Sequence, residues 1–269
     1  MTKTPTRTDA VAWRRAQQAL ACDELVPWEH GTVLRTPSVP TYWDCNLVRV
    51  EGAVPELDAP ALMAAADELL AGMDHRKVEV EDEAAGARLR PAFATGGWHT
   101  ERLAVMLRTG PPPPAPPGVE EVPLSATRDL RAEWYAYDAS DPESMHRLAA
   151  EQEPIGERRG LRAFVIRADA AGGVADRAPG AAGAGATAPV AFATLAPGAG
   201  AAEIDLLYVT PAHRGRGLGA ALVAAALAAG GHDRAWIEAD DQDRPRKLYE
   251  RLGFATVWRR HAFTRAPVS

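Results

Sequence analysis

The sequence predicts an α/β chain built from two successive copies of one unit of strands and helices. Three observations support this prediction. At 269 residues the chain exceeds the length at which a single core usually stops growing, roughly 250 residues. The two halves repeat one order of strand-like and helical patterns at one spacing. Six prolines within residues 111–118 separate the halves, and their extended, semi-rigid backbone is typical of a spacer.

The first half reads as strand, helix, strand, helix and strand. Short apolar runs predict the strands, and apolar residues at helical spacing predict the helices. The expected ranges are 46–50, 59–72, 77–81, 83–94 and 102–107. The second half repeats this order at 205–209, 218–229, 235–239, 243–252 and 255–263.

The spacing between equivalent strands makes the repeat specific. Val50 precedes Val78 by 28 residues, and Val209 precedes Ile237 by the same 28 residues. The second copy is preceded by two further expected strands, 162–167 and 190–195. Between these two strands, residues 168–189 hold mostly alanine and glycine, which bury too little apolar surface to offset the entropy of ordering, so a flexible loop is expected. The expected domains are therefore 1–110 and 119–269, with 111–118 as the linker.

Composition excludes several classes of protein. The formal net charge is −6, from 30 basic and 36 acidic residues, which does not suit nucleic acid or an anionic membrane surface. The two cysteines, Cys22 and Cys45, allow neither a disulfide framework nor a zinc site; they are expected to be ordinary thiols, and no metal is expected. The N-terminus lacks the apolar core of a signal peptide, and no apolar run is long enough to span a bilayer. A cytoplasmic, membrane-free location is expected.

A glycine-rich turn carries the clearest functional signal. Between an expected strand and an expected helix the chain reads Arg214-Gly215-Arg216-Gly217-Leu218-Gly219. The glycines allow a tight turn whose amide groups point inward, and the positive end of the helix dipole adds to their pull, so the turn can hold a pyrophosphate. The equivalent positions of the first half, Pro55, Asp58 and Pro60, lack an N–H donor or carry a negative charge, so that copy is not expected to bind the anion.

These residues carry a resemblance to a known family. The pattern Arg214-x-x-Gly217-x-Gly219, followed by Leu248-Tyr249-x-x-x-Gly253-Phe254, resembles the GNAT superfamily of N-acetyltransferases. The resemblance covers residues 119–265, and the first half is similar to a degenerate GNAT copy, as in tandem GNAT proteins. In the second motif this chain has Gln242 and Pro245 where members often carry Asn and Ala.

The resemblance implies two mixed, strongly bent sheets flanked by helices. In the second domain it implies a sheet that opens beside the strand 203–209, with acetyl-CoA in the gap as co-substrate. The coenzyme would then contact the strand and the turn. The implied cofactor-binding residues are Leu207, Tyr208, Val209, Arg214, Gly215, Arg216, Gly217, Leu218, Gly219 and Ala220.

Two residues match positions of catalytic groups in the family. Glu203 matches a general base found in some members, and Asp205, two residues along the same strand, would share its face and either favour the protonated form of Glu203 or bind the acceptor's ammonium. Tyr249 matches the tyrosine that protonates the departing thiolate. Plainer readings stay open: two solvent-facing acids, and a tyrosine that only fills a core.

The acceptor is expected beside the helices of residues 124–160. Six acids against one base, Arg147, lie between residues 133 and 153, together with three aromatic side chains, so a cationic amine is favoured. The acids are Glu133, Asp138, Asp141, Glu143, Glu151 and Glu153, and the aromatic residues are Trp134, Tyr135 and Tyr137.

The expected function is N-acetyl transfer from acetyl-CoA to a primary amine by direct attack in a ternary complex. The acceptor is a small molecule or a protein: an amino sugar, antibiotic, polyamine, amino acid, protein N-terminus or lysine all fit. The alternative is a non-catalytic acyl-CoA sensor or scaffold. Nucleic acid is not an expected partner, and the oligomeric state stays open.

Overall fold

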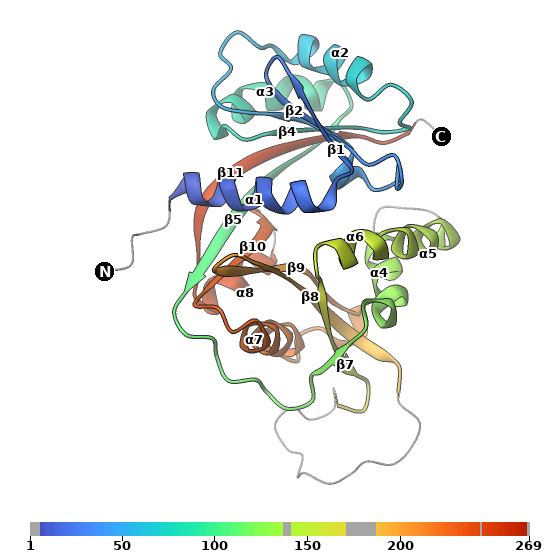
Figure 1. Ribbon diagram of the computed structural model, residues 1–269, viewed down its shortest axis with the longest axis vertical. Helices are drawn as coiled ribbons and strands as arrows, with labels where there is room; N and C mark the ends of the chain where they lie inside the picture. The colour runs from blue at the N-terminus through green and yellow to red at the C-terminus, as the bar shows by residue number, and fades with distance from the viewer. Residues whose placement is uncertain (1–5, 137–140, 171–186, 243, 268–269) are drawn as a thin grey trace. The chain divides into compact units, whose positions relative to one another are not determined.

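The computed structural model describes residues 6–136, 141–170, 187–242 and 244–267 (Figure 1). Contacts within the chain divide it into two compact units. The first unit holds Met1–Met106, Glu238–Glu250 and Ala255–Ser269, and the second holds Leu107–Ile237 and Arg251–Phe254. This division differs from the expected domains, because most of the C-terminal segment packs with the first half of the chain.

The first unit contains a mixed sheet with helices, as the repeat predicts. Its sheet runs in the order β1-β2-β3-β4-β11-β5. The elements are α1 (Arg7–Ala21), β1 (Glu24–Trp28), β2 (Gly31–Arg35), η1 (Trp43–Cys45), β3 (Leu47–Val50), α2 (Ala59–Leu69), β4 (Arg76–Val80), α3 (Glu83–Thr95), β5 (His99–Thr109) and β11 (Phe254–Arg265).

Pairing explains why the C-terminal strand belongs to this unit. β11 runs antiparallel to β4, with His261 opposite Val80 and Arg265 opposite Arg76. Phe263 is fully buried there and stacks on Phe93 of α3, with ring centroids 4.1 Å apart. Burial of two aromatic rings favours this arrangement over a C-terminal strand confined to the second half.

The second unit also contains a mixed sheet with helices, in the strand order β10-β9-β8-β7-β6. β8 and β9 are antiparallel, and β9 and β10 are parallel. The elements are β6 (Glu120–Val122), η2 (Leu124–Thr127), α4 (Arg128–Tyr135), α5 (Pro142–Glu151), α6 (Glu153–Arg158), β7 (Arg162–Arg167), β8 (Pro189–Gly198), β9 (Ala201–Val209), η3 (Pro211–His213), α7 (Leu218–Gly230) and β10 (Arg234–Asp240). The last residues of β10 belong to the first unit, and so does α8 (Arg244–Arg251) except for Arg251.

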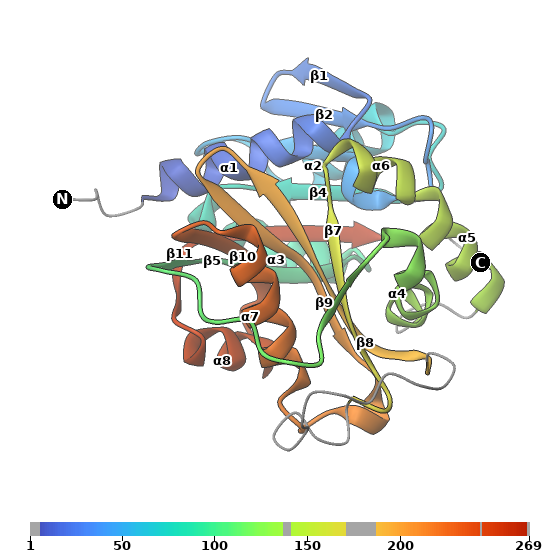
Figure 2. The ribbon, with the colours of Figure 1, turned by 60° about the horizontal axis from the view of Figure 1, so that its bottom comes forward.

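Helices cover both faces of the β8–β9 pair (Figure 2). Leu195 of β8 lies against Gly230 of α7, where an added Cβ would come within 3.1 Å of the leucine side chain. Phe192 lies three residues before Leu195, and side chains alternate along a strand, so Phe192 points to the other face. There it packs with Leu130 of α4. The strand is therefore apolar on both faces, which explains its continuous run of apolar residues.

The expected fold class is confirmed in both units, and so is the order of repeated elements. The expected flexible loop, 168–189, lies largely outside the described residues, because residues 171–186 are not described. Within the described part of the chain, no helix is both long enough and apolar enough to cross a membrane.

Candidate active site

The glycine-rich turn lies between η3 and α7 and has the conformation that its residues predict. Gly215 and Gly217 adopt left-handed backbone angles, with φ of 78° and 80°. A Cβ added at either glycine would meet no atom within 4 Å, so the space beside the turn is open. Gly217 is the N-cap of α7 and provides no side-chain cap for the first amides of the helix. Those amides can therefore donate to an anion.

The matching position in the first unit shows why that copy differs. Asp58 is the N-cap of α2, and its carboxylate accepts a hydrogen bond of 2.8 Å from the Ala61 amide. The helix supplies its own negative charge at the place where a phosphate would bind. Asp58 and Gly217 are both N-caps at the offset of 159 residues, so the sequence correspondence between the two copies is correct at this point.

The two arginines of the turn have different surroundings. Arg214 folds back over the end of β9: its Nε donates to the Val209 carbonyl at 3.0 Å, and its guanidinium lies 5.8 Å from the centre of the Tyr208 ring. Arg216 is exposed. Leu218 is buried and anchors the start of α7, whereas Gly219 and Ala220 are half-buried.

Strand β9 has an open edge beside this turn. β10 pairs with β9 over Ala202–Ile204, whereas β8 accompanies β9 as far as Val209. Within the part of the chain that the structure describes, the pairing between β9 and β10 does not include Leu206–Val209. Leu207, Tyr208 and Val209, the predicted coenzyme-binding part of the strand, lie in this open stretch and are half-buried.

The equivalent strand of the first unit is closed. β3 pairs with β4 up to its last residue, since Val50 lies opposite Val80. The Glu81 amide then donates to the Val50 carbonyl at 3.1 Å. In the first unit, β3 and α2 therefore show neither the open strand edge nor the uncapped N-terminus found in β9 and α7.

The two predicted acids of β9 lie together, as their spacing predicts, and share one cation. Arg159, which follows α6, has an Nη1 atom 2.6 Å from Asp205 Oδ1 and an Nη2 atom 3.8 Å from Glu203 Oε2. The exposed fractions are 8% for the Arg159 side chain and 17% for each acid. The pair is therefore not a set of solvent-facing acids, and the guanidinium offsets the repulsion expected between the two carboxylates.

A β-bulge accompanies this cluster. Thr194 of β8 lies opposite Leu206, but Leu195 lies opposite Ile204, so Asp205 is the extra residue. The Thr194 hydroxyl lies 3.3 Å from Asp205 Oδ2, and it accepts a 3.0 Å hydrogen bond from the Leu206 amide. Neither the bulge nor the roles of Arg159 and Thr194 were predicted from the sequence.

Tyr208 connects the open strand to α4. Its hydroxyl donates to Glu133 at 2.8 Å. Burial and this carboxylate raise the pKa of Tyr208 to about 12, so the phenol stays protonated. Glu133, one of the acids expected to line the acceptor side, is thus bonded within the described structure.

Other members of the acidic stretch also have structural partners. Glu153 pairs with Arg128 at 2.7 Å and with Arg131 at 2.8 Å. Asp141 caps α5. Trp134 remains 38% exposed, while Asp138 and Tyr137 lie outside the described residues. Several acids of this stretch are therefore engaged by other groups of the protein, so it is a weaker acidic surface than its composition predicts.

Tyr249 lies in α8, is 6% exposed and belongs to the first unit. Its role as general acid stays a prediction from the motif.

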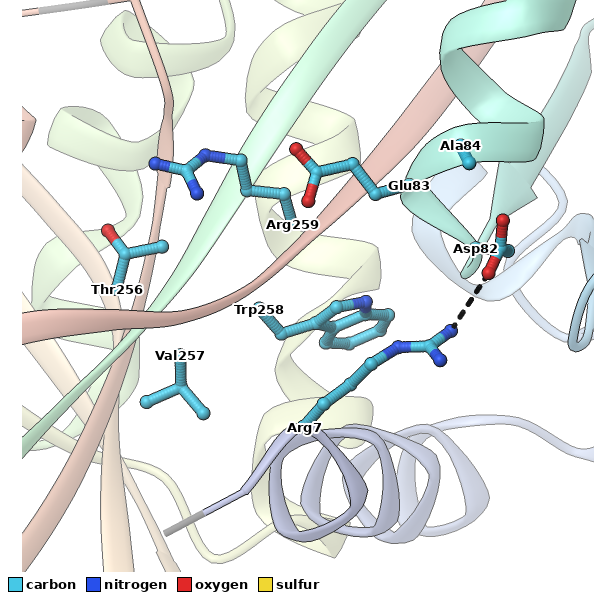
Figure 3. A pocket seen from close by; sticks show the side chains of 8 residues that line it. All are labelled: Arg7, Asp82, Glu83, Ala84, Thr256, Val257, Trp258 and Arg259. Carbon is cyan, nitrogen blue, oxygen red and sulfur yellow. Dashed lines mark ion pairs between the residues drawn. The ribbon is translucent and has the colours of Figure 1, made fainter. Parts of the chain in front are cut away.

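A further hollow lies in the first unit, with a volume of about 330 Å³ (Figure 3). It is lined by Trp258 and by charged residues of both signs. Arg7 pairs with Asp82 at 3.8 Å within this lining, and Arg259 pairs at 3.1 Å with Asp241, which lies outside it. None of the predicted site residues lines this hollow. In the described residues, no group of three or more His, Cys, Asp or Glu side chains could hold a metal ion.

Comparisons with known proteins point to one fold. Residues 164–256 match a family model described as "Acetyltransferase (GNAT) domain". A GCN5-related N-acetyltransferase from Kribbella flavida is 21% identical, with a TM-score of 0.56 over 98% of this chain and 96% of that one. A conserved protein of unknown function from Staphylococcus epidermidis is 11% identical, with a TM-score of 0.64 over 91% of this chain and 94% of that one. No curated protein matches the sequence. At these identities the likeness shows the fold, and it extends over both units.

Proposed function

From the premise that residues 164–256 carry a GNAT acetyltransferase domain, we propose that this protein transfers an acetyl group from acetyl-CoA to a primary amine. One observation carries the proposal: the second unit combines an uncapped helix N-terminus with an open strand edge, and the equivalent helix and strand of the first unit have neither. This combination suits a ligand in which an extended arm is joined to a pyrophosphate.

The residues of the second unit fit acetyl-CoA, which supplies the activated acetyl thioester. The amides at the start of α7 would hold the pyrophosphate, with Arg216 as a nearby positive charge. The strand amides of Leu207–Val209 would hold the pantetheine arm. The open space beside Gly215 and Gly217 supports this fit.

Glu203 is the proposed general base, which accepts a proton from the ammonium group of the acceptor so that the neutral nitrogen can attack directly. Asp205 holds Arg159 at 2.6 Å, whereas Glu203 lies 3.8 Å from it, so of the two acids Glu203 is the more weakly held by that cation. Two carboxylates with one guanidinium leave a net charge of −1, which favours a cationic amine. Tyr249, assigned by its motif, would donate a proton from its hydroxyl to the leaving sulfur.

The test is a screen of primary amines with acetyl-CoA, measuring free thiol and the mass of the acetylated product. The amines would include amino sugars, polyamines, amino acids and peptides. We expect turnover with at least one class, a lower kcat for Glu203→Gln and for Tyr249→Phe, and coenzyme affinity close to that of the unchanged protein in both variants. Tight binding of acetyl-CoA with no thiol release for any amine would instead favour a sensor.

A further inference from the structure

The two cysteines of the first unit, which the transferase site does not use, lie close to each other. Cys22 is the C-cap of α1, and Cys45 is the last residue of η1. Both are reduced and buried, with exposed fractions of 8% and 3%. Their separation of 23 positions in the sequence gives no sign that they meet.

The buried hydroxyl of Thr36 shows how they are brought together. It donates to the Cys45 carbonyl at 3.1 Å and accepts from the amide of Asp23, the residue after Cys22, at 3.4 Å. The Asn46 side chain fixes the same loop by accepting from the Thr36 amide at 2.7 Å. One hydroxyl thus contacts the backbone of Cys45 and of the residue that follows Cys22, which brings the two cysteines to the same site. The Cys45 thiol and the Thr36 hydroxyl both act on Cys22 by lowering its pKa.

The two thiols are not equivalent. The hydrogen bond from Cys45 is the main cause that lowers the pKa of Cys22, and it outweighs the burial that raises it. The thiolate is the form that reacts with oxidants. Cys22 is also the more exposed of the two. Cys22 is therefore the thiol that an oxidant meets first, and Cys45 is placed to react next.

We propose that Cys22 and Cys45 form a redox-active dithiol that a hydroperoxide converts to an intramolecular disulfide. The Cys22 thiolate attacks one peroxide oxygen, the O–O bond breaks, and Cys22 becomes a sulfenic acid as hydroxide leaves. The Cys45 sulfur then attacks the Cys22 sulfur, an S–S bond forms, and the sulfenic oxygen leaves as water. With hydrogen peroxide, two thiols and one peroxide give one disulfide and two waters.

The disulfide would tie the end of α1 to the segment that leads into β3. α1 contributes Arg14, whose Nη2 donates to Glu79 at 2.6 Å, and Gln18, which bridges Glu79 and Arg49. Cross-linking beside these contacts restricts the unfolded chain, so the oxidised protein should melt at a higher temperature than the reduced protein.

The experiment treats the full-length reduced protein with hydrogen peroxide and then alkylates it under denaturing conditions. Intact mass should show two alkylated thiols before treatment and none after it, and a reductant should restore both. Proteolysis should yield one peptide pair joined through Cys22 and Cys45 within a monomer. Two thiols that remain open to alkylation, or a disulfide found only between chains, would overturn the proposal.

Matched single variants separate the two steps. Cys45→Ser should accumulate a Cys22 sulfenic acid that dimedone traps, whereas Cys22→Ser should give much less adduct at Cys45. Equal labelling of the two variants would contradict the assigned order. The measurement on the unchanged protein stands without the variants if either fails to fold. The proposal is independent of the transferase, since acetyl-CoA takes no part in these measurements.

Discussion

Replacement of Gly217 by Asp would place a negative charge at the N-cap of α7, the position that Asp58 holds in α2. In α2 that carboxylate lies 2.8 Å from the Ala61 amide. At position 217 the backbone is left-handed and not extended, so the main expected effect is the charge itself, next to the place where the pyrophosphate is proposed to bind. We therefore expect Gly217→Asp to weaken binding of acetyl-CoA.

Coulomb's law gives the size of the expected loss of affinity for acetyl-CoA, and Gly217→Asn is the matched control. One negative charge about 4 Å from another costs roughly 1 kcal/mol in water and about 4 kcal/mol at an effective dielectric constant near 20. This corresponds to a Kd for acetyl-CoA about 5- to 700-fold higher for Gly217→Asp than for Gly217→Asn. Asn has the same shape without the charge, and both residues visit the left-handed region more readily than other side chains.

Isothermal titration calorimetry with acetyl-CoA gives the dissociation constants of the Asp and Asn variants. At high salt the ratio of these two constants should be smaller, because salt screens the added charge. Both variants should be destabilised by roughly 1–2 kcal/mol, because the left-handed angle at position 217 disfavours a side chain and a better cap regains only a few tenths of that over Gly. Equal Kd values for the Asp and Asn variants, with both proteins folded, would refute an anion site at this helix.

Three further predictions concern stability, each measured by urea unfolding. Arg159→Met should lower the free energy of unfolding by roughly 2–4 kcal/mol, because it leaves two largely buried acids without their cation, and by less in an Asp205→Asn background. Phe93→Ala should cost about 3–5 kcal/mol, since the ring is fully buried; a smaller loss would indicate a core that collapses into the space. Burial lowers the pKa of His261 to about 4 from 6.5, so the unfolded chain takes up the proton first and stability should fall as the pH drops from about 6.5 to about 4. His261→Phe should reduce that slope by up to about 1.4 kcal/mol per pH unit, and an unchanged slope would contradict the assignment.

Local chemistry allowed the sequence to predict much of the second unit. The glycines at 215 and 217 permit left-handed angles, and a helix follows them directly, so the turn could be located without a structure. The alternation of side chains on a strand placed Glu203 and Asp205 on one face, and their shared contact with Arg159 agrees with this. In both cases the relevant geometry spans only a few residues.

The features that the sequence did not predict depend on partners far along the chain. Arg159 lies 46 positions before Asp205 and carries no local signal of its role. The C-terminal strand pairs with β4, almost two hundred residues earlier, so the expected domain of 119–269 could not include this exchange. Cys22 and Cys45 are brought together by hydrogen bonds of the Thr36 hydroxyl, which no spacing in the sequence indicates.

The bulge at Asp205 explains why equal spacing gives two different strands. Val50 and Val209 end equivalent strands, yet Val50 is paired with β4, while the pairing of β9 with β10 stops at Ile204. An extra residue bends and twists a strand, and a bend at Asp205 would turn the rest of β9 away from β10. The Thr194 hydroxyl accepts from the Leu206 amide, so this side-chain bond partly replaces the regular ladder there. The open edge begins at the next residues, so the bulge, and not the glycine turn alone, distinguishes the open strand of the second unit from the closed strand of the first.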